Sequence, residues 1–260
     1  MNLTPEALKR EASATGFEQE PLEKVLRLIA LLDGLYSHPF LKPRIALKGG
    51  TALNLYHFDV PRLSVDIDLN YIGAPDRETM ILERPTLERA IQAVCSREAV
   101  AVARMPADHA GGKWRLTYVA SHGGPGHLEL DINFLLRTPL WPCVLLECRA
   151  VGSVRGPSTS VLDVHELAAG KMAALLARSA SRDIFDVHAL LSASALDPEK
   201  LRLAFVVYGG MNRKDWRTVS TAEVKPDANE VQTTLLPVLR PGVAPVPPRA
   251  GIGLRSAPCA

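Results

Sequence analysis

Two aspartates separated by one residue, Asp66 and Asp68, are the residues of this sequence best suited to chemistry. They lie in the segment VPRLSVDIDLNYIG, where polar residues alternate with Val65, Ile67 and Leu69. This period of two places both carboxylates on one face of a strand. Carboxylates so placed repel each other unless a cation neutralises them, and Mg²⁺ prefers oxygen ligands and keeps waters for substrate phosphates. The pair predicts a divalent metal site, although ordinary surface strands can also carry two acidic residues.

A glycine pair precedes this strand by about fifteen residues. In RIALKGGTALNLYHF, a short apolar run is followed by Gly49, Gly50 and Thr51 and then by a helical pattern. Glycines let the backbone approach a phosphate closely, and the start of a helix offers unpaired amide groups at the positive end of its dipole. The P-loop pattern GxxxxGK[ST] is absent, so the sequence is not that of a standard phosphate-loop ATPase. Glycine pair and carboxylates together predict binding of a nucleoside triphosphate.

The segment ALKGGTALNLYHFDVPRLSVDIDL resembles the first motif of the nucleotidyltransferase superfamily, in the form found in the AbiEii/AbiGii toxin group. This resemblance implies a fold in which a Gly-Gly or Gly-Ser turn and a helix precede a DxD strand. It also implies a third carboxylate on a neighbouring strand, completing a two-metal site. Ser64 could orient a metal-bound carboxylate through a hydrogen bond. The nucleotide-binding residues expected in this region are Lys48, Gly49, Gly50, Thr51, Arg62 and Ser64.

The third carboxylate is expected in HLELDINFLL, where Glu129 and Asp131 share one strand face by the same period-two argument. Asp131 is the first choice and Glu129 the second. The metal ligands predicted from the sequence are therefore Asp66, Asp68 and Asp131. An alternative is that this segment is a half-exposed hairpin strand whose acidic residues have no special role.

A second resemblance to the toxin group lies in HELAAGKMAALLARSASRDIFDVHALL, which has a Lys, then an Arg, then RDxxD. Lys171 and Arg178 are seven residues apart and share a helix face, from which both could reach nucleotide phosphates. Asp183 and Asp186 are neighbours on the next helix. The resemblance implies a nucleotide or base contact for Asp186, whereas Asp183 could pair with Arg182 or cap its helix.

The elements that must position these residues follow from hydrophobic periodicity. The predicted fold class is α/β (α+β): a nucleotidyltransferase-like mixed β-sheet core with flanking helices and a C-terminal helical lobe. We expect the core over residues 1–155, the helical lobe over 156–236 and a disordered Pro- and Gly-rich tail over 237–260. The individual elements expected are helices within 4–38, from 51, over 85–97, 163–178 and 182–193 and from 197, and strands near 44–48, 64–70, 113–120, 127–136 and 144–151, with a turn at 121–126.

Composition agrees with a globular protein: 47% of the 260 residues are hydrophobic and 22% are charged. The net charge of +2 neither demands nor excludes nucleic acid. The four cysteines are scattered without a CxxC pair, which argues against a zinc site or a disulfide framework. The start lacks the apolar core of a signal peptide, and no apolar run is long enough to span a bilayer. We therefore expect a cytoplasmic protein without membrane contact.

The predicted reaction is in-line attack of an acceptor hydroxyl on the α-phosphate of an NTP, which transfers a nucleoside monophosphate. Asp66 and Asp68 would bridge two Mg²⁺ ions, or Mn²⁺, Asp131 would hold one of them, and Lys171 would neutralise phosphate. The resemblance implies RNA as acceptor, in particular the 3′ end of a tRNA, and a cognate antitoxin. Two alternatives stay open: transfer to a small molecule or a protein, and a non-catalytic nucleotide- or antitoxin-binding module.

Overall fold

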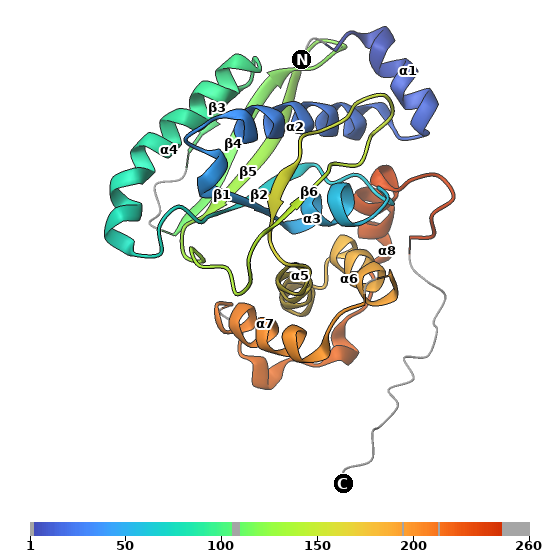
Figure 1. Cartoon of the computed structure of the whole chain (residues 1–260). Coiled ribbons are helices and arrows are strands. Elements are labelled where there is room, and N and C mark those ends of the chain that lie inside the picture. Colours follow the sequence, from blue (N-terminus) through green and yellow to red (C-terminus); the bar gives the residue numbers. More distant parts are fainter. Residues whose placement is uncertain (1–2, 106–109, 194, 213, 246–260) are drawn as a thin grey trace.

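A mixed β-sheet forms the centre of the molecule (Figure 1). The computed structural model describes residues 3–105, 110–193, 195–212 and 214–245, and within them the sheet has seven strands in the order β3-β4-β5-β2-β1-β7-β6. Strands β2 and β5 are parallel, as are β1 and β7, and the other neighbours are antiparallel. The strand bounds are β1 Ile45–Lys48, β2 Asp66–Tyr71, β3 Ala101–Arg104, β4 Gly111–Val119, β5 Pro125–Asn133, β6 Val144–Leu146 and β7 Thr159–Val161.

Helices pack around the sheet in two groups (Figure 1). Helix α2 packs against α4 and β5, whereas α5 packs against α6, α7 and the short α3. Apolar residues spaced three and four apart, such as Leu22, Leu26 and Ile29, bury one side of α2 in the core. The helix bounds are α1 Pro5–Thr15, α2 Gln19–Ser37, α3 Gly49–Ala52, α4 Arg77–Arg97, α5 Val164–Arg178, α6 Ser181–Ala193, α7 Pro198–Gly210 and α8 Ala228–Glu230.

The predicted fold class is confirmed. A mixed sheet is flanked by helices, and helices α5, α6 and α7 come after its last strand in the sequence. The hairpin predicted around 121–126 joins β4 and β5. None of the described helices combines the length and the apolar character needed to cross a membrane.

Several predicted boundaries are wrong. Helix α4 already begins at Arg77, where Asp76 accepts a hydrogen bond from the Thr79 amide (2.8 Å), and it continues through Pro85. The Gly-Gly pair is the first turn of α3 rather than a turn before a helix that starts at Thr51. Strands β3 and β7 were not predicted, because runs of three or four residues show too little alternation to distinguish them from loops.

The predicted disordered tail is also wrong at its beginning. Val238 and Leu239 are buried, the Leu63 amide donates to the Val238 carbonyl (2.7 Å), and the Arg240 amide donates to the Pro61 carbonyl (3.0 Å). These backbone bonds hold the segment against the chain that leads into β2. The remainder of the predicted tail, 246–260, lies outside the described residues.

Candidate active site

The sheet register brings the acidic residues of β2 and β5 together. Asp68 is paired with Asp131, and Asp66 with Glu129. In the flanking strands, Lys48 of β1 is opposite Asp68. Neighbouring strands lie about 4.8 Å apart, so these side chains are immediate neighbours on one face of the sheet.

Glu129, unlike the three aspartates, forms an ion pair with a lysine. The Lys113 ammonium lies 2.6 Å from Glu129 Oε2, and both side chains are substantially exposed, by 62% and 37%. Lys113 therefore already neutralises Glu129. This favours Asp131 over Glu129 as the third carboxylate, because a metal would have to displace an ion pair to use Glu129.

The electrostatics of the aspartates favour a bound cation. Burial raises the pKa of Asp66, and the charge of Asp68 raises it further. Burial also raises the pKa of Asp131; Lys48 and Lys113 oppose this, whereas Asp68 adds to it. The raised pKa values mean that these negative charges are incompletely compensated by the protein itself. A divalent cation would supply the missing positive charge.

The donor set fits a hard divalent cation, because it consists of carboxylate oxygens. As the side chains stand, however, no three His, Cys, Asp or Glu side chains in the described part of the chain converge closely enough to enclose a metal ion. The strand register already brings the backbones of the aspartates close to one another. Coordination of one metal ion by these residues therefore requires only that their side chains rotate to other rotamers.

The two glycines are explained by close approach of side chains from β2 and its lead-in. Gly49 has φ +71°, and a Cβ there would lie 2.1 Å from Asp68 Oδ2. A Cβ on Gly50 would lie 2.8 Å from Ser64 Oγ and 3.7 Å from Lys171 Nζ. A Cβ at either position would meet these side chains, and Gly49 also has a positive φ, so both positions favour glycine.

We expect Gly49→Ala to lower the transfer rate by about tenfold or more, because alanine is strained at positive φ and its methyl group would displace the Asp68 carboxylate. The measurement is the initial rate of nucleotide incorporation. Gly123→Ala is the matched control: Gly123 has φ +84° but an open space around the Cβ position. Equal rates for the two variants would contradict this account of Gly49.

Thr51, predicted to bind nucleotide, is fully buried, and its hydroxyl donates to the Asp66 carbonyl. The Thr51 side chain therefore fastens α3 to β2 and does not reach the cavity. Ser64 is also buried, but it lines the cavity above the aspartates.

Arg62 and Asp186 form a buried ion pair between the lead-in to β2 and helix α6. Arg62 Nη2 lies 2.6 Å from Asp186 Oδ2, and the two side chains are 2% and 0% exposed. Arg62 Nε donates a second bond to Asp186 Oδ1 at 2.8 Å. Burial would raise the pKa of Asp186, but the charges of Arg62 and Lys171 outweigh it and hold this pKa well below its usual range.

Lys171 connects this pair to the cavity. Its ammonium lies 2.9 Å from both Asp186 Oδ2 and Asp183 Oδ1, and Arg178 Nε lies 2.7 Å from Asp183 Oδ2. Lys171 and Arg178 thus converge, as their helical spacing predicts, and Asp183 holds them together. Arg62 and Asp186 are both buried beside Lys171, and the expectation that they contact the nucleotide directly stays a prediction. Asp183 pairs with these two cations rather than with Arg182.

A cavity of about 320 Å³ lies over the carboxylates. Its charged and polar lining residues are Arg62, Ser64, Asp66, Asp68, Lys113, Glu129, Asp131, Lys171, Arg178, Arg182 and Asp183. An adjoining cavity of about 250 Å³ is lined in part by Lys48, Gly49, Asp68 and Lys171. Two lining residues were not predicted from the sequence, Lys113 and Arg182. The position of Lys113 next to the carboxylates follows only from the β4–β5 register.

Comparison with known proteins agrees with this fold. A family model described as "Nucleotidyl transferase AbiEii toxin, Type IV TA system" matches residues 30–243. No curated protein matches the sequence.

Among solved structures, MenT4, a nucleotidyltransferase toxin from Mycobacterium tuberculosis H37Rv, is similar with a TM-score of 0.61 and 20% identity, over 91% of this chain and 84% of that chain. JHP933 from Helicobacter pylori is similar with a TM-score of 0.50 and 16% identity, over 76% of this chain and 83% of that chain. At these identities the likenesses show a shared fold.

The family match includes the glycine pair, the DxD strand, β5 and the Lys171 to Asp186 region. Membership implies an NTP substrate, a divalent metal ion and a cognate antitoxin. The chain therefore belongs to the AbiEii family and is a nucleotidyltransferase toxin of a type IV toxin–antitoxin system.

Proposed function

We propose that this toxin transfers a nucleoside monophosphate from an NTP to a hydroxyl group of RNA, at the 3′ end of a tRNA, with Mg²⁺ at Asp66, Asp68 and Asp131. The observation that carries the proposal is the pairing of Asp68 with Asp131 beside the glycine backbone of α3. The three aspartates and the backbone of Gly50 then line one cavity. We further propose that the toxin acts in the cytoplasm, where NTP and RNA occur together.

Each residue would have a role in the reaction that follows from its position in the site. Bound Mg²⁺, or Mn²⁺, would supply Lewis-acid stabilisation of the phosphate charge and of the attacking hydroxyl. Asp66, Asp68 and Asp131 would hold the cations, and Asp131 would also accept the proton of the attacking hydroxyl. The amides of Gly49 and Gly50 would lie along the phosphates.

The cations at the helical side of the cavity would neutralise the departing diphosphate. Lys171 is held by Asp183 and Asp186 with 12% of its side chain exposed, so its position is fixed before substrate binds. Arg178 shares Asp183 but has 64% of its side chain exposed, which leaves it able to turn toward a phosphate. Lys48, which lines the adjoining cavity, would also neutralise phosphate charge.

RNA is supported as acceptor by the exposed cations on the cavity rim. Lys113 is 62% exposed and Arg178 is 64% exposed, and Arg182 also lines the cavity. Such cations can contact the phosphates of a polymer that continues out of the cavity, which a small-molecule acceptor would not use. The small-molecule and protein acceptors remain outcomes of the experiment.

We expect purified toxin with Mg²⁺ and α-labelled NTP to label total RNA, and tRNA most strongly, and expect excess EDTA to abolish labelling. Each NTP is tested separately to identify the preferred one. Label that enters protein or small molecules instead would overturn the RNA acceptor. Absence of label in every fraction, despite NTP binding measured by calorimetry, would favour a non-catalytic binding module.

A further inference from the structure

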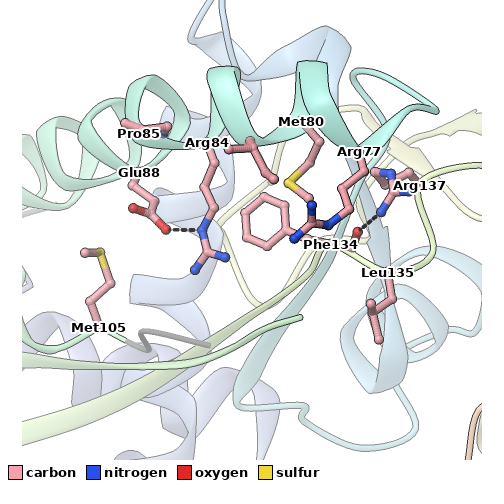
Figure 2. A pocket seen from close by; sticks show the side chains of 10 residues that line it. Arg77, Met80, Arg84, Pro85, Glu88, Met105, Phe134, Leu135 and Arg137 are labelled. Atoms are coloured by element: carbon pink, nitrogen blue, oxygen red, sulfur yellow. Dashed lines mark hydrogen bonds and ion pairs between the residues drawn. The ribbon is translucent and has the colours of Figure 1, made fainter. Parts of the chain in front are cut away.

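Two cavities lie near the carboxylates in the sequence, but they are on different faces of the sheet. One, of about 430 Å³, lies between helix α4 and the chain that follows β5 (Figure 2). Figure 2 shows Met80 and Arg84 extending from α4 on either side of the Phe134 ring. Side chains alternate along a strand, so Ile132 and Phe134 point to the face opposite to Asp131. The sheet therefore separates this cavity from the carboxylates.

The other is the adjoining cavity of about 250 Å³, which continues the cavity over the carboxylates, here called the carboxylate cavity. The residues that line both are Gly50, Asp68, Lys171 and Arg178. These are residues proposed to hold the metal and the phosphates of the NTP. An NTP bound at the carboxylates therefore has the adjoining cavity next to its phosphates.

The lining of the adjoining cavity becomes apolar away from these charged residues. Its other lining residues include Leu162, Leu167, Gly170, Ala174 and Tyr208, together with the buried carboxyl group of Glu166. The cavity thus extends from the cations to the surface between helices α5 and α7. An NTP has a matching distribution of polarity, with a charged triphosphate and a flat base whose faces are apolar.

An aromatic side chain, Tyr208 of α7, is held in a fixed position in this lining. Its hydroxyl donates to Glu166 Oε2 at 2.9 Å, and Glu166 is only 1% exposed. Gly170 lies against the ring from α5, because a Cβ there would be 3.5 Å from Tyr208 Cδ1. A larger side chain at this position would cover part of the ring. Bases of nucleotides stack on aromatic rings that are left accessible in this way.

The acceptor is expected on the other side of the metal. Asp131, proposed to accept the hydroxyl proton, lines the carboxylate cavity together with Lys113 and Arg182. Ribose and base are attached to the α-phosphate, and Asp68, which would hold the metal at that phosphate, borders both cavities. With the acceptor entering over Asp131, the adjoining cavity is the space that remains for the base.

We infer that the base of the NTP binds in the adjoining cavity, against the Tyr208 ring and beside Gly170, with Glu166 as a positioning residue for the ring. The inference rests on the proposed placement of metal and phosphates and adds a site for the base. Stacking on a ring accepts every base, so this site contributes affinity for the NTP rather than strict choice among the four. The terminal nucleotide of the acceptor is a different occupant, which the test distinguishes.

The test compares binding of each of the four NTPs with binding of inorganic triphosphate, by calorimetry with Mg²⁺ and without acceptor. Inorganic triphosphate has the phosphates but no base. Wild-type toxin is expected to bind the preferred NTP about tenfold more tightly, the effect of stacking one base. Tyr208→Leu should remove most of this advantage, and Gly170→Ala should reduce it about threefold. Both variants should bind inorganic triphosphate like the wild type, which also shows that the fold is retained.

Matched controls are Tyr118→Leu and Gly210→Ala. Tyr118 is buried in β4 away from the linings of both cavities, and a Cβ on Gly210 would meet open space. Both controls should keep the full advantage. Tyr208→Phe keeps the ring and should lose at most about twofold. In transfer assays Tyr208→Leu should raise KM for NTP about tenfold, whereas kcat and KM for the acceptor should be unchanged, because the base lies away from the reacting atoms.

The possible failures are distinct. Tyr208→Leu and Gly170→Ala variants that keep the wild-type advantage would overturn the base site and leave the proposed function standing. Equal losses in Tyr208→Phe and Tyr208→Leu would overturn the ring as the contact. A raised KM for the acceptor with an unchanged KM for NTP would assign the cavity to the acceptor and also overturn the inference. Wild-type toxin that binds neither NTP nor inorganic triphosphate would overturn the proposed phosphate site and the base site together.

Discussion

The Asp66→Asn variant is expected to lose nucleotidyl transfer by at least about 10³-fold, because removing one carboxylate from the cluster weakens the metal on which stabilisation of the phosphate charge depends. The same variant should be at least as stable as the wild type without metal. Burial and Asp68 raise the pKa of Asp66, so the ionised carboxylate costs stability in the folded protein. Asparagine keeps the shape and removes that cost.

The direction in which stability changes with pH distinguishes a variant that has lost the metal from one that has lost its fold. A carboxyl with a raised folded pKa makes the metal-free protein less stable as pH rises between its usual and its raised pKa. Bound metal should reverse this trend in the wild type. We therefore expect Mg²⁺ to raise the Tm of the wild type at neutral pH, to raise it less in acid, and to leave the Tm of Asp66→Asn nearly unchanged.

Glu129→Gln is the matched control, since Glu129 is the register partner of Asp66 in the parallel pair β2–β5 but is already neutralised by Lys113. Its rate should stay within about threefold of the wild type, because no metal ligand is lost. A double Asp66→Asn, Asp68→Asn variant with wild-type rate would disprove the assignment of the metal site.

The Arg62→Ala variant is expected to lose about 3–5 kcal/mol of unfolding free energy, the range for removing one partner of a buried ion pair. Asp186 would then keep Lys171 and Asn54 as its partners among the described residues, in a site with no solvent exposure. Urea unfolding at neutral pH measures this. Arg217→Ala, which removes an exposed pair with Asp215, is the control and should leave stability unchanged.

The double variant Arg62→Met, Asp186→Leu distinguishes stability from positioning. It replaces both buried charges by apolar groups and should recover much of the lost stability, as buried pairs often allow. Its transfer rate should stay low, because Lys171 loses one of the two carboxylates that fix its ammonium. Arg62→Ala within about 1 kcal/mol of the wild type would show that the pair contributes little.

Acid should lower the stability of the wild type, because it protonates Asp186 in the Arg62–Asp186 ion pair. The pKa of Asp186 is lowered in the fold, so its contribution to stability is present above the usual pKa of an aspartate and is lost as pH falls through the folded value. The double variant lacks both groups and should lose less stability on acidification than the wild type.

Much of the candidate site was predictable because its signals are local. The period of two in a strand fixes that Asp66 and Asp68 share a face, and the helical spacing of Lys171 and Arg178 fixes that these two share one. The resemblance to the toxin group added Asp131 and the fold class, which the sheet agrees with. Spacing arguments of this kind depend only on backbone geometry within one element.

The partners across elements were decided by tertiary structure alone. Arg62 and Asp186 are 124 positions apart and meet only because α6 packs beside the lead-in to β2. The β4–β5 register sets Lys113 opposite Asp131, yet the Lys113 ammonium bonds Glu129, its diagonal neighbour, and the strand order sets β5 against β2. The sequence determined which side chains face the same way within each element, whereas packing of distant elements decided which charges meet, because that choice depends on burial and pairing across the whole sheet.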